Sequence, residues 1–348
     1  MKNLKFIIII LIILFQTGNV FSNNNIFNVN NIDLGKESSE NNEKLINKAF
    51  YKAFDKLTNR LLLEEDYKNL SNTSLEQIKR LISYYQITNR DEKKKKTSYR
   101  KINVFFDKKN MHNFFFTKNI LYSDIINTEA ILFPLLIIKD ENFIYTQNYF
   151  YNNWNNERFD DLIQYILPSE NIEVIQKINL NKNNIYKLEI SDFFKEYETQ
   201  NIVFANIEID QNKANIFLKT RIEKKNINKK LFINKDKNIK EEDFYKKIIL
   251  KIDKEVKNLI KSQNLIDVRT PSFLNAKINL NNISNLYEFN ERLEKIDLID
   301  NFYVQQINKD YVFVKIKYLG KINKIINKLK EENINLNVVG GQWHLKII

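Results

Sequence analysis

Two groups of side chains in this sequence have the types and spacing for chemistry, and the first lies in the stretch "NNWNNERFDDLIQYIL". Its carboxylates are Glu157, Asp160 and Asp161, and the aromatic residues before or among them are Tyr149, Tyr151 and Trp154. Paired carboxylates beside aromatic rings are what glycosidases use to hydrolyse sugar chains. A second interpretation competes, because apolar residues recur at roughly helical spacing and predict a core-facing stripe: Trp154, Phe159, Leu162, Ile163 and Ile166. We favour the structural stripe and keep a hydrolase as the alternative.

The second group lies in "YVFVKIKYLG", which alternates as a strand does. Its residues on one predicted face are Tyr311, Phe313, Lys315 and Lys317. Aromatic rings and lysines on an open sheet face are also what stacks nucleic-acid bases. The first strand of the same C-terminal region, "LNAKINL", offers only Asn275, Lys277 and Asn279 on that face, and the glycine-containing signature of RNA-binding modules is missing. We therefore predict a protein-docking face and no nucleic acid.

Scarce residue types exclude several chemistries. None of the five glycines lies between Gly35 and Gly320. Phosphate-binding loops, dinucleotide-binding turns and nucleophile elbows all require glycine, so none can occur in that span. The chain has no cysteine and only two histidines, His112 and His344, in different predicted domains. This excludes thiolate sites and disfavours zinc, so we predict no cofactor, no metal, and a structural role for both histidines.

The chain opens with "KNLKFIIIILIILFQTGNVFSNNN". The apolar run from Phe6 to Phe15 is shorter than the roughly 20 residues needed to cross a bilayer. Lys2 and Lys5 precede it, and Val20-Phe21-Ser22 resembles a signal-peptidase site, so residues 1–22 predict a signal peptide cleaved after Ser22. The mature protein would be periplasmic, with no stable membrane span. The alternative is an inner-membrane protein anchored by residues 6–15.

Composition indicates a folded protein of more than one domain. Of 348 residues 43% are hydrophobic, including 25 Phe and 17 Tyr, which is enough for real cores. The net charge of +12 suggests an anionic partner. The sequence is also rich in Asn, Lys, Ile, Phe and Tyr, whose codons are A/T-rich. We favour this codon bias as the source of the charge.

The N-terminal part is predicted to be a mixed α/β region. Residues 23–42 lack a sustained period and indicate a flexible arm. Residues 43–266 follow, with a possible subdomain boundary near 148. An amphipathic helix is expected over 45–61, and Ser74 with Gln77 has the capping-box form at the start of a second. "YYQIT" and "KINVFF" predict strands.

Further strands and helices are expected along the same region. "AILFPLLII" predicts a buried strand with "NFIYT" returning beside it, and Pro134 within it indicates an edge or a bulge. Two short helices are expected, capped by Ser169 and by Ser191. A hairpin turning at Gln211-Asn212 should precede a helix over 241–261. That helix is expected to pack on the sheet, with a membrane-surface role as the alternative.

Residues 272–348 form the clearest unit. They read strand, helix, strand, strand, helix, strand, with a terminal hairpin at Gly340-Gly341. This βαββαβ order predicts a ferredoxin-like domain. The fold class is therefore α+β, an N-terminal mixed α/β region followed by a ferredoxin-like C-terminal domain.

Three stretches carry a family resemblance: "KAFYKAFDKLTNRLL", "KINVFFDKKNMHNFF" and "ILFPLLII". They are similar to uncharacterised exported proteins of Gram-negative bacteria, the domain-of-unknown-function family 2066. "LIQYILPSENIEVIQKI" and "VKIKYLG…LNVVGGQWHL" resemble its alphaproteobacterial members. The resemblance implies export and no established activity, so no functional residue is transferred.

These observations favour a non-catalytic role. We expect a periplasmic envelope accessory or assembly protein that binds another envelope protein or a cell-wall component. The expected binding residues are Tyr149, Tyr151, Trp154, Tyr311, Phe313, Lys315 and Lys317. The alternative is a carbohydrate-active hydrolase of the peptidoglycan type that uses Glu157 with Asp160 or Asp161.

Overall fold

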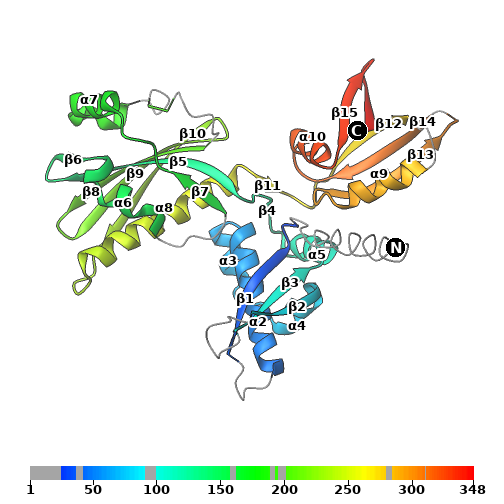
Figure 1. Cartoon of the computed structure of the whole chain (residues 1–348), viewed down its shortest axis with the longest axis horizontal. Coiled ribbons are helices and arrows are strands. Elements are labelled where there is room, and N and C mark those ends of the chain that lie inside the picture. The colour runs from blue at the N-terminus through cyan, green and yellow to red at the C-terminus, as the bar shows by residue number, and fades with distance from the viewer. Residues whose placement is uncertain are drawn as a thin grey trace, which may run out of the picture. The chain divides into compact units, whose positions relative to one another are not determined.

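The computed structural model describes residues 25–36, 42–90, 99–156, 162–188, 193–194, 201–279, 284–309 and 311–348. They form a mixed α+β protein with several sheets (Figure 1), as the composition and patterning predict. The chain divides into two compact units. The first comprises Met1–Thr58, Asn69–Leu121 and Ile266–Ile348, and the second comprises Asn59–Lys68 and Tyr122–Leu265. The units are thus interleaved along the chain, which passes between them at 58–59, 68–69, 121–122 and 265–266.

The N-terminal part of the first unit is an antiparallel sheet with strand order β1-β3-β2. Its strands are β1 (Asn28–Lys36), β2 (Ile82–Arg90) and β3 (Tyr99–Phe106). The predicted amphipathic helix is confirmed as α2 (Asn42–Leu61), which buries its apolar stripe from Ala49 to Leu61. Phe54 of this stripe lies 6.4 Å from Phe106 of β3, centroid to centroid. Helix and sheet therefore share one core.

Strand β1 corrects the prediction of a flexible arm over residues 23–42. Val29, Ile32 and Leu34 are buried, and Ile26 and Phe27 before the strand are buried as well. The register against β3 shifts between Val29 and Ile32, which breaks the period of two that marks a strand in a sequence. This irregularity, in an asparagine-rich stretch, hid the strand.

The capping box predicted at Ser74 is confirmed. Helix α4 (Leu75–Leu81) begins at a capping box: Ser74 Oγ accepts from Gln77 N at 3.3 Å, and Ser74 N donates to Gln77 Oε1 at 3.4 Å. "KKNMHNFFF" forms α5 (Lys108–Lys118), capped by the Asp107 side chain. A short helix, α3 (Glu64–Asn69), lies between α2 and α4.

The second unit is built on a six-stranded sheet of order β10-β9-β8-β5-β6, with β7 also paired to β5. The strands are β5 (Thr128–Ile138), β6 (Glu141–Phe143), β7 (Ile163–Ile166), β8 (Asn201–Asp210), β9 (Lys213–Ile222) and β10 (Lys225–Asn234). The buried strand and the hairpin at Gln211-Asn212 are confirmed. Strand β10 is an addition that no sequence signal predicted.

Pro134 lies at a point in β5 where one side of the strand has no β-strand partner, so its missing N–H breaks no ladder hydrogen bond there. On one side of β5, β7 pairs with Thr128 to Ile131 and β6 with Leu136 to Ile138, so Pro134 falls between the two partners. The buried Asn148 side chain covers this gap by donating to Pro134 O at 2.9 Å and to Phe143 O at 3.1 Å. The proline therefore stands at a local edge within a central strand, as its chemistry indicates.

Helices cover both faces of this sheet. Helix α8 (Glu241–Ser262) packs on one face through Phe244, Ile248, Ile252 and Val256, which confirms the predicted packing role. Helix α7 (Ile172–Leu180) packs on the other face through Val174 and Ile178. Its cap is Asn171 and not the expected Ser169. The helix expected after Ser191 lies largely outside the described residues.

The expected helical stripe from Trp154 to Ile166 is wrong. The chain forms 3-10 turns at Tyr145–Gln147 and Trp154–Asn156 around a short helix, α6 (Tyr149–Asn153). It then enters β7, where Ile163 and Tyr165 are buried and Gln164 is exposed. Parallel pairing with β5 overrides a spacing that also fitted a helix. Two short strands, β4 (Tyr122–Ser123) and β11 (Leu265–Ile266), occur where the chain passes between units.

The C-terminal part of the first unit follows the predicted element order. The elements are β12 (Ser272–Asn279), α9 (Ser284–Glu294), β13 (Ile299–Ile307), β14 (Tyr311–Tyr318), α10 (Ile322–Glu331), β15 (Ile334–Val339) and β16 (Gln342–Ile347). Gly340 and Gly341 have φ of 59° and 80°, the positive values that a two-residue hairpin turn needs. The sheet order is β13-β14-β12-β16-β15. The terminal strand β16 inserts parallel to β12, so β15 does not lie beside β12 as the last strand of a plain ferredoxin-like sheet would.

Candidate protein-docking face

One face of the C-terminal sheet is buried and the other is open. Along β14, Val312, Val314 and Ile316 are buried, whereas the residues between them are partly exposed. The buried face lies against α9 and α10, whose Phe289 and Ile325 are both fully buried (Figure 1). The open face carries all four of the residues predicted on this strand: Tyr311, Phe313, Lys315 and Lys317. The structure therefore keeps these four together.

Lysines lie directly over the aromatic rings of this open face. Lys277 Nζ is 4.2 Å from the Tyr311 ring centroid, and Lys315 Nζ is 4.3 Å from the Phe273 ring centroid. The Tyr311 and Phe313 rings meet edge to face, with centroids 5.1 Å apart. Each cation–π contact orients a long, flexible side chain before any partner arrives. The face thus presents ordered ammonium groups above rings.

Phe273 was missed in the sequence. The predicted strand begins at Leu274, whereas β12 begins at Ser272, and Phe273 shares the alternating face of Asn275 and Lys277. Its side chain is 51% exposed. A signal was available, because Phe273 continues the same alternation by two residues. The neighbouring strand therefore does contribute an aromatic ring, contrary to the interpretation of "LNAKINL".

At the edge of the face near β13, the carboxylate of Asp300 pairs with a lysine of β14. Lys317 Nζ pairs with Asp300 Oδ2 at 2.7 Å, and this hydrogen bond raises the pKa of Lys317. Next to it, Asn301 donates to the Tyr303 hydroxyl at 2.9 Å. Because both groups of the ion pair are partly exposed, the pair orients Lys317 more than it stabilises the fold.

The other side of the face is polar. His344 on β16 lies opposite Lys277, and Asn337 on β15 lies opposite His344. Lys346 follows on the same side of β16 and is exposed. Lysines therefore run across the face from β14 to β16, which suits an acidic surface on a partner.

The other three predicted binding residues lie elsewhere. Trp154 is fully buried, with its ring 5.5 Å from that of Tyr165, so it is a core residue and not part of an exposed surface. Tyr149 packs on Tyr245 at 4.8 Å. The Tyr151 hydroxyl donates to Pro168 O at 2.7 Å. The segment is folded into both cores of its sheet because α6 places its aromatic residues on opposite sides.

The carboxylates of the alternative hydrolase hypothesis, Glu157, Asp160 and Asp161, lie outside the described residues. Within the described ranges, His, Cys, Asp and Glu nowhere gather in a group of three or more that could hold a metal ion. Among the helices of the described residues, none is both long and apolar enough to cross a membrane.

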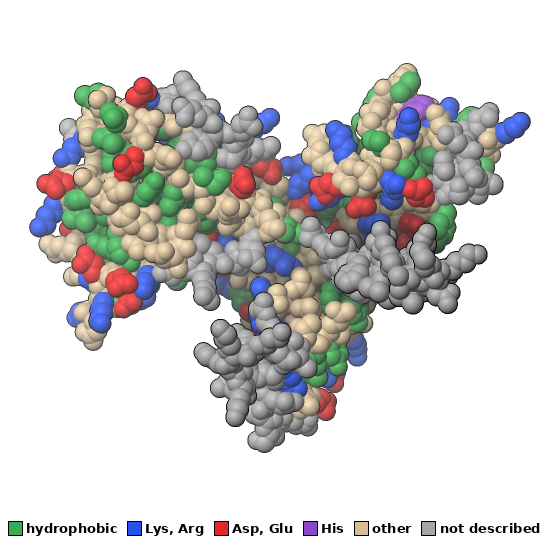
Figure 2. Space-filling model, in the orientation of Figure 1, with side chains coloured by type: hydrophobic (Ala, Val, Ile, Leu, Met, Phe, Trp, Pro, Cys, Tyr) green, Lys and Arg blue, Asp and Glu red, His purple; other side chains and the backbone are tan. Residues whose placement is uncertain are grey.

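Buried charged groups in the described residues are tied into the fold, in contrast to the charged side chains of both signs that Figure 2 shows at the surface. In the second unit, Asp253 accepts from the Tyr165 hydroxyl at 2.9 Å and from Lys257 Nζ at 2.6 Å. In the first unit, Lys108 Nζ donates to Ile299 O at 2.7 Å, and burial lowers the pKa of Lys108. Removing one partner of such a contact would leave the other charge desolvated and unpaired, so these groups are held in place by the fold.

His112, one of the two scarce histidines, is 7% exposed and packs edge to face on Phe27 at 5.5 Å. Burial, and then the charge of Lys108, lower its pKa to about 4. The imidazole is therefore neutral at neutral pH, and its contacts are those of a core ring. This agrees with the structural role predicted for it.

Comparison with known proteins gives little more. No family model matches the chain, and no curated protein matches it. The crystal structure of the lipoprotein GNA1162 from Neisseria meningitidis aligns with 38% of this chain and 97% of its own, at 10% identity and a TM-score of 0.23. A similarity this weak carries no argument.

Proposed function

We propose that this protein is an exported, non-catalytic accessory or assembly factor of the cell envelope. It acts by docking another envelope protein on the open face of its C-terminal sheet. We treat that domain as a ferredoxin-like sandwich enlarged by the strand β16. The family resemblance seen in the sequence agrees with this role and remains a prediction.

The single observation that supports the proposal is the contrast between the two faces of one sheet. The buried face is apolar, and the open face combines Tyr311 and Phe313 with Lys277 and Lys315 in ordered contacts. Aromatic residues at the centre of a surface, surrounded by polar groups, are typical of protein interfaces. The lysines favour a partner with an acidic surface.

A position-specific photo-cross-linker tests this docking face in cells. We expect a defined adduct when the photoreactive residue replaces Phe313. None is expected when it replaces Tyr287 of α9, which is 69% exposed on the opposite side of the same domain. Lys315→Glu should abolish the Phe313 adduct while leaving the melting temperature unchanged. Equal adducts from positions 313 and 287, or an adduct that survives Lys315→Glu, would contradict the proposal.

Export is tested separately by the mass of the N-terminal peptide of the native protein. Cleavage after Ser22 predicts a mature chain that begins at Asn23, recovered in the soluble periplasmic fraction. An intact N-terminus in the membrane fraction would instead support an anchor formed by residues 6–15. Docking and export can fail independently, so each measurement decides one part of the proposal.

A further inference from the structure

The outer strand of the second sheet, β10, is a long and regular edge. All ten of its residues pair with β9 in unbroken register, from Lys225 opposite Ile222 to Asn234 opposite Lys213. The edge strands β1, β2 and β13 each carry at least one register shift, and β15 has only six residues. Bulges and short lengths are the usual means of blunting a sheet edge. Of the edges that the described residues form, β10 lacks both.

The turn into β10 determines which of its backbone groups point outward. Glu223 and Lys224 both have positive φ, 46° and 70°, as in a two-residue hairpin turn. Ile222 and Lys225 therefore close the hairpin as a hydrogen-bonded pair, and such pairs alternate along the strands. Counting every second pair from Ile222 and Lys225 makes Asn212 and Lys235 a hydrogen-bonded pair as well. The hydrogen bond from Lys235 N to Asn212 O at 2.7 Å agrees with this count.

The remaining residues of β10 direct their N–H and C=O groups away from β9. They are Asn226, Asn228, Lys230, Phe232 and Asn234. An added strand would find alternating donors and acceptors along the whole edge.

A cavity lies beside this edge. Its volume is about 350 Å³, and its walls come from Asn215, Ile216 and Phe217 of β9 and from Lys230 and Phe232 of β10. Phe232 is 71% exposed. Lys230 stands opposite Phe217, and Phe232 opposite Asn215, so these four side chains share one face of the sheet. Lys230 and Phe232 also offer outward backbone groups, so a side chain of an added strand would reach the cavity.

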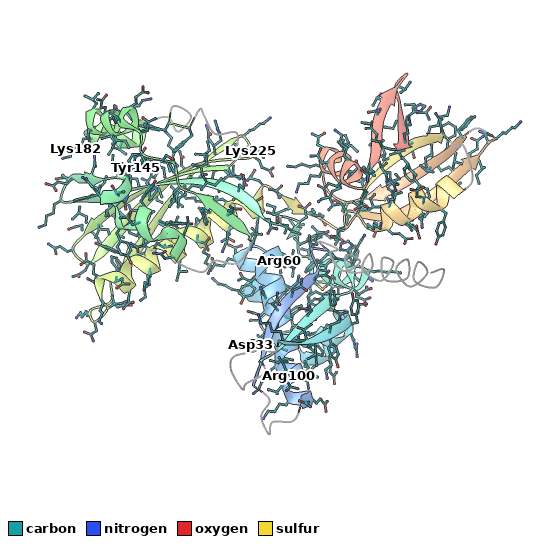
Figure 3. All side chains as sticks on the ribbon, viewed as in Figure 1. Asp33, Arg60, Arg100, Tyr145, Lys182 and Lys225 are labelled. Carbon is teal, nitrogen blue, oxygen red and sulfur yellow. The ribbon has the colours of Figure 1, made fainter. Side chains whose placement is uncertain are left out.

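The strand is basic in its first half and apolar in its second. Lys225, Lys229 and Lys230 are exposed, Leu231 and Phe232 follow them, and β10 contains no acidic residue. Lys225 stands at its start (Figure 3). A second copy pairing antiparallel about the middle of the strand would set Lys229 or Lys230 against the same lysine of the other copy, which like-charge repulsion opposes.

We infer that β10 is a strand-addition site for an extended segment of another protein, acidic along one half and apolar along the other. The segment hydrogen-bonds to the outward groups of Asn226 to Asn234. It places its carboxylates against Lys225 and Lys230, because Lys229 Nζ already pairs with Glu255 Oε1 at 3.7 Å, and it places one apolar side chain in the Phe217–Phe232 cavity. This site is separate from the proposed docking face on β14.

The test uses the full-length mature chain and fluorescent ten-residue peptides built on valine and threonine. One half of each peptide carries glutamates and the other carries phenylalanine, and both orders are tested by anisotropy. We expect one order to bind with a Kd below about 1 mM. Replacing its glutamates by lysine should weaken binding by about tenfold or more. N-methylation of alternate peptide bonds on the pairing edge should have a similar effect, because it removes the strand hydrogen bonds.

Protein variants provide the matched control. Asn228→Pro removes one outward N–H and leaves the β9 ladder intact, so it should weaken peptide binding by about tenfold. Asn228→Ala keeps that N–H and should bind as the wild type does. If the proline variant fails to fold, the N-methylated peptide on the wild-type chain gives the same information.

Three results would overturn the inference. The first is no binding of either glutamate peptide at millimolar concentration. The second is equal binding of the N-methylated or lysine-substituted peptide, which would show that strand pairing or acidity is not required. The third is a homodimer in sedimentation that Asn228→Pro dissociates, which would assign the edge to a second copy of this chain.

Discussion

The two aromatic groups that stand out in the sequence have opposite fates. In the segment Tyr149–Trp154 the rings turn inward, and Trp154 is fully buried. On β14, Tyr311 and Phe313 stay on an open sheet face with lysines over or beside them. Both groups combine aromatic and polar residues, so composition alone does not separate a core from a surface.

The difference between them is how the polar residues are spaced. On β14 the lysines share the alternating face of the rings, and the opposite face is uniformly apolar, so one face must remain open. In Tyr149–Trp154 the polar residues are asparagines that bind backbone: Asn153 donates to Tyr149 O at 2.9 Å, and Asn152 to Thr146 O at 2.8 Å. Because these amides are satisfied by nearby backbone carbonyls, the segment can turn its aromatic rings into the core without burying unpaired polar groups.

The largest effect that would sharpen this comparison is expected from Trp154→Ala. Removing a fully buried indole leaves a cavity beside Tyr165 and should lower the free energy of unfolding by about 3–5 kcal/mol. Chemical denaturation measures the loss, and Trp154→Phe, which retains a ring, should lose less. A loss below about 1 kcal/mol for the alanine variant would indicate that Trp154 is exposed and not part of the core.

Alternation and local chemistry explain how much of the fold was predictable. The strand β14, the capping box at Ser74 and the glycine turn after β15 were all predicted, because each depends on residues close together in the chain. Strand β1 was not, because its bulge breaks the period of two. Strand β10 was not, because its apolar residues do not alternate cleanly: Lys229 separates Ile227 from Leu231 on the partly buried side, and Phe232 lies on the exposed side.

The candidate site was half predictable for the same reason. The four residues of β14 follow from one alternating strand. The pairing of Lys315 with Phe273 and of Lys277 with Tyr311 requires the register between β12 and β14, which no local pattern contains. The burial of Trp154 depends on the parallel pairing of β7 with β5, which is equally non-local.

The buried imidazole of His112 makes the stability of the fold depend on pH. The pKa of His112 is about 4 in the folded chain, against 6.5 when exposed, because burial and Lys108 disfavour the charged form. Asp300 and Asp107 oppose this shift without cancelling it. The unfolded chain therefore takes up a proton first as pH falls. Stability should be full above about pH 6.5 and decline toward pH 4, by about 3 kcal/mol in total.

Denaturation midpoints measured across pH 4–7 test this decline. The variant His112→Phe keeps a ring against Phe27 and removes the titrating group, so its stability should fall less over the same range. Parallel curves for the variant and the wild type would show that carboxylates elsewhere account for the whole pH dependence.

Asn206 offers a smaller effect of opposite sign. It is 1% exposed on β8, and neither its amide nitrogen nor its amide oxygen has a hydrogen-bond partner. Replacing an unsatisfied buried amide by an apolar group of similar size removes a desolvation penalty, so Asn206→Leu should raise the free energy of unfolding by about 1–2 kcal/mol.

Asn148→Leu is the matched control, because Asn148 is equally buried but its amide binds Pro134 O, Phe143 O and Phe150 N. That variant should lose about 2 kcal/mol or more. If both variants lose the same amount of stability, the Asn206 amide stabilises the folded chain in spite of lacking hydrogen-bond partners, which would contradict the prediction.

The smallest change in stability is expected on β14, where it tests the other half of the comparison. Phe313→Ala removes a ring from the open face and should cost less than about 1 kcal/mol, whereas Val312→Ala, one residue away on the buried face, should cost about 2 kcal/mol despite removing fewer atoms. The same Phe313 substitution should weaken partner binding, and the valine substitution should not. If Phe313→Ala lowers the free energy of unfolding as much as Val312→Ala does, the Phe313 ring is packed as Trp154 is, and this face of the sheet is a core surface and not an exposed one.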